Sequence, residues 1–185
     1  MGMPPENIEL IPNGIDMKEH SDLPPRSYFR ERHGMSDDDE LLLFLGRIDR
    51  IKGLDMLLDA FGLVARSRTN CTLVLAGPDF GYRAAVERRI RELGLNGRVL
   101  FTGELRGQDK LEAMAAADVC VVPSQFDIFS MTALEALACG IPLILTDRCG
   151  IAEMIHDVAM VVPYDHDAMA DAILRMLSDN ELRAN

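Results

Sequence analysis

The chain has 185 residues, of which 48% are apolar and 26% are charged, and its formal net charge is −11. This length suits one globular domain with a full hydrophobic core. The acidic balance argues against a nucleic-acid binder, because such proteins neutralise phosphates with basic side chains. The longest apolar runs, such as Leu41 to Leu45, are far shorter than the roughly 18 residues that a membrane span needs.

The first residues and the cysteines indicate in which compartment the protein acts and whether it binds zinc. The sequence does not open on a basic region followed by an apolar run, so we expect no signal peptide. The four cysteines show no C-x-x-C spacing, and two of them lie within apolar runs, as free buried thiols do. We therefore expect a protein of the reducing cytoplasm, without a zinc site.

Short apolar runs alternate with helix-period stretches along the chain. Strands are expected at residues 8–11, 40–46, 72–77, 98–103, 119–123, 141–146 and 160–163. Helices are expected at residues 54–66, 82–93, 108–117, 131–138 and 167–177. The strands from residue 40 onward are apolar on both faces, which is typical of parallel strands covered on both sides. The alternation predicts βαβ units and a doubly wound, parallel α/β sheet of about six strands with helices on both faces.

Residues 16–39 are polar and contain proline, and we interpret them as a long loop with at most a helical turn. Their acidic end, at residues 37–40, is expected to be a solvated turn before the first sheet strand. In open parallel sheets, ligands bind beyond the carboxyl ends of the strands. The functional residues should therefore come from the segments at 46–47, 77–78, 103–104, 124–130 and 146–150.

The first of these segments places two cations close together. Arg47 directly follows a predicted strand, and Lys52 comes five residues later, where the next helix begins. Two cations beside free backbone N–H groups form a site for a phosphate or diphosphate. The glycine spacing matches neither a Walker loop nor a dinucleotide fingerprint. The alternative interpretation is a pair of ordinary surface cations.

A second candidate site lies where residues 124–130 lead into a predicted helix. Backbone N–H groups around residues 128–130 should point outward at the helix N-terminus, which favours an anion. Asp127 precedes this helix and Glu135 lies in its second turn. Both carboxylates can accept hydrogen bonds from the vicinal hydroxyls of a sugar or ribose. Glu135 could instead be a partnered core group, because an unpaired buried carboxylate is costly.

Several segments, in order, carry a resemblance to a known family. Residues 11–16, IPNGID, look like the interdomain PNGVD segment of the family 4 retaining glycosyltransferases, which have the GT-B fold. The GR and KG pairs at 46–47 and 52–53 are similar to that family's GR…KG segment. Residues 124–140 resemble its PS…E-x7-E…CG signature, and Gly150 with Glu153 resembles the following GG-x-x-E. The resemblance extends over nearly the whole chain and implies the Rossmann-like, C-terminal half of a GT-B fold.

The resemblance also implies roles for individual residues. Arg47 and Lys52 would bind the diphosphate of a UDP- or GDP-linked sugar, and Glu135 would bind its ribose. Asp127 would contact the transferred sugar, and with Arg47 and Lys52 it would form the catalytic set. Asp127 is one methylene shorter than the family's usual Glu, and Phe129 replaces the small residue of the family's FG pair. The expected donor-binding residues are Gly46, Arg47, Lys52, Gly77, Gly103, Ile128, Phe129, Ser130 and Glu135.

A retaining transfer, in which the acceptor attacks the face that the diphosphate leaves, needs negative charge stabilised on the leaving group. Arg47, Lys52 and the helix N-terminus would supply this stabilisation. No metal or other cofactor is expected, because GT-B enzymes generally need none. Residues 165–167 match the D-x-D pattern of metal-dependent glycosyltransferases, but they open a predicted helix, where we expect Asp165 to be the N-cap.

By the same resemblance, residues 1–39 are an interdomain-linker-like segment with a first strand and a loop, and residues 40–185 are the donor-binding domain. The N-terminal acceptor domain is absent from the chain, so we expect the chain alone to bind nucleotide weakly and to transfer no sugar. A glycan or lipid-linked acceptor, and any membrane association, would act through that domain. Two alternatives stay open: a non-catalytic nucleotide-binding or interaction module on the same fold, and an unrelated phosphoacceptor or flavin-binding domain that uses Asp49 or the acidic loop.

Overall fold

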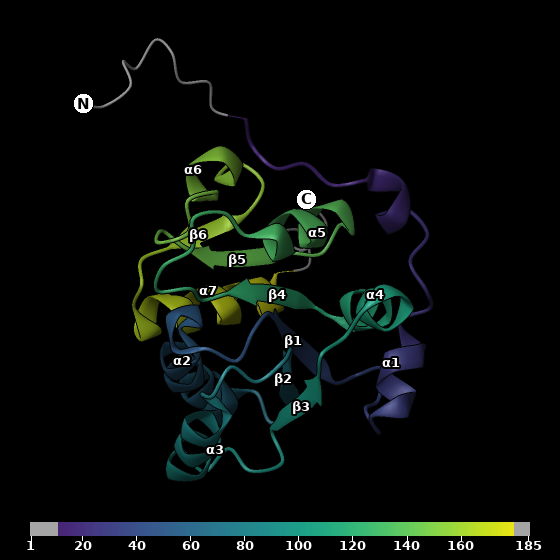
Figure 1. The fold of residues 1–185 in the computed structure, drawn as a ribbon. Helices are drawn as coiled ribbons and strands as arrows, with labels where there is room; N and C mark the ends of the chain where they lie inside the picture. Colours follow the sequence, from purple (N-terminus) through teal and green to yellow (C-terminus); the bar gives the residue numbers. More distant parts are fainter. Residues whose placement is uncertain (1–10, 180–185) are drawn as a thin grey trace, which may run out of the picture.

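Six parallel strands form one sheet in the computed structural model, which describes residues 11–179 (Figure 1). The strands are β1 (Glu40–Leu45), β2 (Cys71–Ala76), β3 (Val99–Gly103), β4 (Val119–Val122), β5 (Leu143–Thr146) and β6 (Met160–Val162). Their order across the sheet is β3-β2-β1-β4-β5-β6. The order reverses between β1 and β4, which pair through Leu42 with Val119 and Leu43 with Cys120. The predicted doubly wound, Rossmann-like sheet is therefore confirmed.

Helices cover both faces of this sheet (Figure 1). They are α1 (Ser27–Arg32), α2 (Leu54–Ser67), α3 (Arg83–Glu92), α4 (Gly107–Ala116), α5 (Met131–Ala138), α6 (Ala152–Ile155) and α7 (His166–Ser178), with short 3-10 helices η2 (Met17–His20) and η3 (Arg50–Lys52). One face packs against α2, α3 and α7, and the other packs against α1, α4, α5 and α6. None of the described helices combines the length and the apolarity that a membrane span requires.

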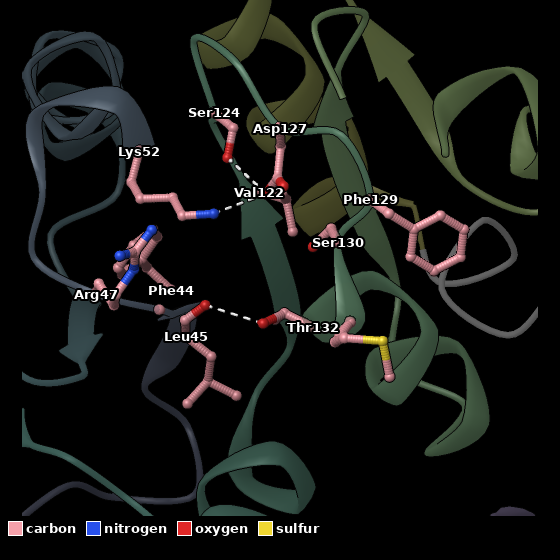
Figure 2. Close-up of a pocket in the computed structure, with 12 residues that line it drawn as sticks. Phe44, Leu45, Arg47, Lys52, Val122, Ser124, Asp127, Phe129, Ser130 and Thr132 are labelled. Atoms are coloured by element: carbon pink, nitrogen blue, oxygen red, sulfur yellow. Dashed lines mark hydrogen bonds and ion pairs between the residues drawn. The ribbon is translucent and has the colours of Figure 1, made fainter. Parts of the chain in front are cut away.

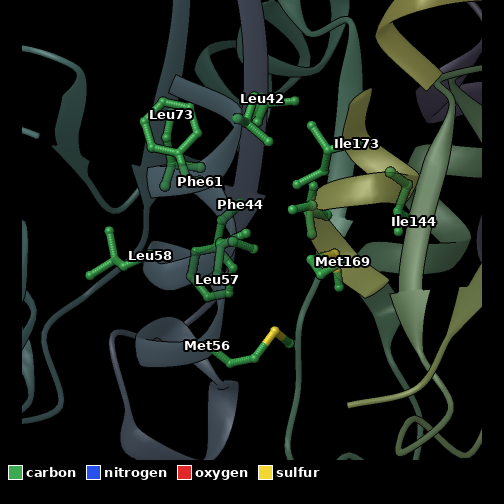
Figure 3. Close-up of a cluster of buried hydrophobic side chains, with 14 of the residues drawn as sticks. Leu42, Phe44, Met56, Leu57, Leu58, Phe61, Leu73, Ile144, Met169 and Ile173 are labelled. Atoms are coloured by element: carbon green, nitrogen blue, oxygen red, sulfur yellow. The ribbon is translucent and has the colours of Figure 1, made fainter. Parts of the chain in front are cut away.

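The alternation of side chains along β1 builds the two cores. Leu42 and Phe44 belong to the core under α2 and α7 (Figure 3), whereas Leu41 and Leu43 belong to the core under α4 and α5. All four side chains are buried. Successive strand residues point to opposite faces, so a fully apolar run serves a strand that is covered on both sides.

The structure corrects the expectation for residues 16–39. This segment is not a loop with at most one helical turn, because it contains both η2 and α1. Phe29 and Arg30 on α1 are buried, and the Arg30 side chain bonds to the backbone carbonyl of Ala116, which lies far away in the sequence. The residues of this segment are mostly polar, so the sequence pattern did not predict that part of it packs against the sheet. The acidic stretch is a turn with exposed Asp37 and Asp38, as predicted, but Glu40 already belongs to β1 and forms an ion pair with Arg68.

The boundaries of the other helices and strands differ less from the predicted ones. The strand predicted at residues 141–146 is β5, and it begins at Leu143 rather than Ile141, because the Ile141 N–H donates to the Ala136 carbonyl as the chain leaves α5. The short helix α6 was not predicted. The expected strand at residues 8–11 lies almost wholly outside the described residues, and Ile11 itself is in no strand.

Candidate functional site

The carboxyl ends of β1 and β4 open into a cavity of about 260 Å³ (Figure 2). The strand order reverses between β1 and β4, so the loops that follow these two strands lead to helices on opposite faces of the sheet and leave a crevice between them. The loop after β1, the loop after β4 and the first turn of α5 form its walls. The lining residues are Phe44, Leu45, Gly46, Arg47, Lys52, Val122, Ser124, Asp127, Phe129, Ser130, Met131 and Thr132.

Arg47 is the cation at the end of β1. Its side chain is exposed, and its Cζ atom lies 4.8 Å from the centroid of the Phe80 ring. Such a stacked arrangement attracts the guanidinium to the ring face and limits its motion. No carboxylate within residues 11–179 forms an ion pair with Arg47. Its N–H donors are therefore available to an anion in the cavity.

Lys52 and Asp127 form an ion pair across the cavity (Figure 2). The Lys52 Nζ atom lies 2.7 Å from Asp127 Oδ2, and the two side chains are 19% and 14% exposed. Ser124 Oγ donates a longer hydrogen bond of 3.4 Å to the same oxygen. The cation that the resemblance assigns to the diphosphate thus also holds the carboxylate that it assigns to the sugar.

Close backbone approach brings these two side chains together. Gly53, which follows Lys52, has φ = 71°, and a Cβ atom there would lie 1.9 Å from the Pro123 carbonyl oxygen. Only glycine allows η3 to lie this close to the end of β4. The Gln125 N–H also donates to the Ile51 carbonyl at 2.9 Å. The backbone on both sides of the Lys52–Asp127 pair is therefore fixed.

The far side of the Asp127 loop is fixed in the same way. The Gly150 N–H donates to the Asp127 carbonyl at 2.8 Å, and the Asp127 N–H donates to the Arg148 carbonyl at 3.3 Å. A Cβ atom on Gly150 would lie 2.2 Å from the Ile128 carbonyl oxygen. The glycine at this position thus allows the two loops to touch.

The N-terminus of α5 faces the cavity. Ser130 is its N-cap, and the Ser130 hydroxyl accepts a hydrogen bond from the Ala133 N–H at 3.2 Å. The Thr132 hydroxyl donates to the Leu45 carbonyl at 3.1 Å, which ties the first turn of α5 to the end of β1. The N–H groups at a helix start carry partial positive charge, so this helix end adds to the attraction of Arg47 and Lys52 for an anion.

The remaining predicted residues do not line the cavity. Ile128 is 80% exposed. Gly77 and Gly103 lie beside each other after β2 and at the end of β3, where the Gly77 N–H donates to the Gly103 carbonyl at 2.7 Å. Glu135 lies in the second turn of α5, where its Oε1 atom accepts a hydrogen bond from Lys110 Nζ at 2.9 Å. The structure thus gathers Gly46, Arg47, Lys52, Asp127, Phe129 and Ser130 at one cavity.

Sequence reasoning missed four residues of this region: Phe80, Lys110, Ser124 as a partner of Asp127, and Thr132. The loop signal at residues 124–130 included Ser124 but gave it no role. Phe80 and Lys110 bear no local signal, because their partners lie on other elements of the fold.

Two aspartates considered for other chemistry are capping residues. Asp49 accepts a hydrogen bond from the Ile51 N–H at 3.2 Å and so caps η3, which leaves no support for it as a phosphoacceptor. Asp165 accepts hydrogen bonds from the Asp167 and Ala168 N–H groups at 3.0 and 2.9 Å, as predicted for an N-cap. Within residues 11–179, His, Cys, Asp and Glu side chains form no cluster of three or more that could hold a metal ion.

Comparison with known proteins identifies the family. The family described as glycosyl transferases group 1 matches residues 26–185. An uncharacterized glycosyltransferase of Methanocaldococcus jannaschii is 33% identical over 182 residues, which cover 95% of this chain and 46% of that protein. The lipopolysaccharide glucosyltransferase WaaG of Escherichia coli is 29% identical over 188 residues, covering 97% of this chain and 49% of WaaG.

Solved structures agree with this assignment. HepE of Anabaena, crystallised in complex with UDP and glucose, aligns with a TM-score of 0.88 at 26% identity, covering 99% of this chain and 50% of HepE. The chain spans about half the length of the curated relatives that it matches. It has the parallel sheet of one half of a GT-B fold, and it belongs to the glycosyl transferases group 1 family.

Proposed function

We propose that the chain is the nucleotide-sugar-binding half of a retaining glycosyltransferase that transfers a hexose from a UDP- or GDP-linked donor to a glycan or lipid-linked acceptor. The observation that carries the proposal is Arg47, which has no carboxylate partner within residues 11–179 and lies at a cavity beside a helix N-terminus. The complexes of HepE with UDP and with UDP-glucose support a nucleotide-sugar donor.

In this proposal the anionic groups of the donor meet the cationic wall of the cavity. Arg47 and the N–H groups at the start of α5 bind the diphosphate. Lys52 lies beside this group and is ion-paired with Asp127. Charge-assisted hydrogen bonds from a guanidinium to phosphate oxygens are among the stronger ones in proteins. Asp127 accepts a hydrogen bond from a hydroxyl of the donor sugar, and Glu135 accepts one from the ribose.

The same groups promote departure of the diphosphate. When the bond between the sugar and the diphosphate oxygen breaks, the electron pair stays with the diphosphate, and its growing charge is stabilised by Arg47, Lys52 and the helix end. Asp127 accepts the hydrogen bond from the sugar through its other carboxylate oxygen, because Lys52 and Ser124 already engage its Oδ2 atom. No metal ion or other cofactor is required by this arrangement of charges.

The chain supplies the donor site, and a second domain would supply the acceptor site. Its span of about half the length of its relatives supports this division, in which residues 1–39 form the interdomain-linker-like segment and residues 40–185 the donor-binding domain. We propose that the 185-residue chain binds nucleotide but transfers no sugar alone, and that the protein acts in the cytoplasm. Detectable sugar transfer by the purified chain would contradict this division.

A thermal-shift titration with UDP and with GDP tests the donor site. A nucleotide at about 100 times its dissociation constant stabilises the folded chain by about 2.7 kcal/mol. We expect one of the two nucleotides to raise the unfolding temperature of the wild-type chain and of Arg50→Ala, and to have little effect on Arg47→Ala or Glu135→Ala. Arg50 is an exposed arginine of the same loop outside the cavity lining, so it is the matched control. An equal shift in Arg47→Ala would contradict the proposal.

A further inference from the structure

One ion pair joins α4 to α5 next to the donor cavity. Lys110 is in the first turn of α4, and its Nζ atom lies 2.9 Å from Glu135 Oε1 on α5. The two side chains are 27% and 18% exposed, so the pair is mostly shielded from solvent. Within residues 11–179, the second carboxylate oxygen of Glu135 receives no hydrogen bond. Glu135 therefore has one oxygen held by the protein and one oxygen available.

The position of Glu135 on α5 directs that available oxygen. Glu135 follows Thr132 by three residues and Met131 by four, and both of these line the cavity. Residues at these spacings share one face of a helix. Helical side chains lean toward the helix N-terminus, so the Glu135 carboxylate extends along α5 toward the cavity.

We propose that Lys110 is a positioning residue for the donor's ribose: it holds Oε1 of Glu135 so that Oε2 accepts a hydrogen bond from the ribose hydroxyls. This inference rests on the proposed function, in which Glu135 binds the ribose. A free Glu side chain samples many rotamers and loses that freedom when it binds a ligand. Because Lys110 restricts the carboxylate before the nucleotide arrives, less affinity is lost to ordering.

Lys110 also balances charge near the donor. The chain has a formal net charge of −11, and a nucleoside diphosphate is itself an anion. An isolated Glu135 carboxylate would repel the diphosphate, whereas the paired Lys110 offsets this repulsion. Repulsion acts on every nucleoside diphosphate equally, but the hydrogen bond acts only on those that have ribose hydroxyls. The two effects can therefore be separated by comparing two nucleotides on each variant.

The test measures the affinity of whichever of UDP or GDP binds the wild-type chain, and that of its 2′,3′-dideoxy counterpart, by calorimetry. We expect wild type to prefer the ribonucleotide by roughly 10- to 100-fold, the range for a hydrogen bond to a charged group. Lys110→Met should reduce this preference by roughly tenfold, and Lys110→Arg should restore most of it. Glu135→Ala should abolish the preference. Arg88→Met, which removes one positive charge from exposed α3, should retain it.

The outcomes separate the inference from the proposed function. If Lys110→Met keeps the wild-type preference, the inference is overturned while the donor site stands. If wild type binds both nucleotides equally, the inference and the ribose role of Glu135 are overturned, while the diphosphate site at Arg47 stands. If wild type binds neither UDP nor GDP, both are overturned. The unfolding temperature without ligand shows whether Lys110→Met is folded; if it is not, Lys110→Ala, which also removes the hydrogen-bond donor to Glu135, gives the same comparison.

Discussion

The two ends of the sheet each hold arginine near aspartate, but they use these residues differently. At the amino end, Arg30 is 1% exposed and donates to the carbonyls of Ser36, Asp39 and Ala116 and to Asp118 Oδ2. At the carboxyl end, Arg47 is exposed and stacks on a ring without an ion-pair partner within residues 11–179.

This difference separates a structural cluster from the proposed binding site. The guanidinium of Arg30 forms its hydrogen bonds within the protein, because an unpaired charge in the interior would be destabilising. The guanidinium of Arg47 is exposed to solvent, and in the proposed function its donors bind the diphosphate of the donor. The two residues are of the same type, and what distinguishes them is whether their N–H donors already have hydrogen-bond acceptors within the protein.

The largest effect is expected from Arg30→Ala. Removing one partner of a buried charge pair costs about 3–5 kcal/mol of folding free energy. Arg26→Ala is the matched control: Arg26 bonds to the other oxygen of Asp118, but its side chain is 42% exposed, so its loss should cost below about 1 kcal/mol. Urea unfolding of the two variants measures both values. Equal losses in the two variants would contradict the structural role of the amino-end cluster.

A smaller and different effect is expected from Asp127→Asn at the carboxyl end. The substitution frees Lys52 for the diphosphate, so affinity for the nucleotide alone should stay equal or rise. Affinity for the nucleotide sugar relative to the nucleotide should fall by roughly tenfold, because a charge-assisted hydrogen bond to the sugar is replaced by a weaker neutral one. Calorimetric titrations with UDP and UDP-glucose, or GDP and GDP-mannose, measure this ratio. An unchanged ratio would show that Asp127 does not contact the sugar, and Asp147→Asn on an exposed loop is the control.

Near neutral pH the smallest effect concerns the buried thiols, which take no part in either cluster. Burial raises the pKa of Cys71 and of Cys120 from 9.0 to about 12, and that of Cys139 to about 11. A raised folded-state pKa means that the unfolded chain releases these protons first as pH rises. The stabilisation is therefore complete below about pH 9 and is lost between pH 9 and 12.

Two measurements check this expectation. Unfolding free energies should be the same at pH 7 and pH 8 as far as the thiols are concerned, and should fall above pH 9. Alkylation at pH 8 should be slow in the folded chain and fast in urea, since only thiolates react. Rapid alkylation of all four thiols in the folded chain would contradict their burial.

Much of the fold could be predicted because its information is local. The apolar runs that became β1 to β6 are short, two-sided and separated by helix-period stretches, and these patterns depend on neighbours in the sequence. Helix α1 escaped prediction because its burial depends on Arg30, whose partners Ala116 and Asp118 are distant in the sequence. A polar hexapeptide with three charged residues does not by itself indicate a buried face.

The site divides in the same way. Strand ends point to Arg47 and Asp127 because the edge of a parallel sheet is set by the order of elements. The Lys52–Asp127 pair and the Lys110–Glu135 pair could not be predicted, since each depends on how two loops or two helices pack. The assignment of Glu135 to the ribose came from resemblance and stays a prediction; the structure adds that Lys110 holds one oxygen of the Glu135 carboxylate.

The central claim is that Arg47 and the start of α5 form a diphosphate site. Calorimetric titration of the chain with UDP, UMP and uridine, and with GDP, GMP and guanosine, tests it most directly. We predict that one diphosphate binds at least tenfold more tightly than its monophosphate, as expected for charge-assisted bonds worth about 1.5–3 kcal/mol. In Arg47→Ala this advantage should disappear, while Arg50→Ala should keep it. A diphosphate advantage that survives Arg47→Ala, or one that is absent from the wild-type chain, would contradict the account.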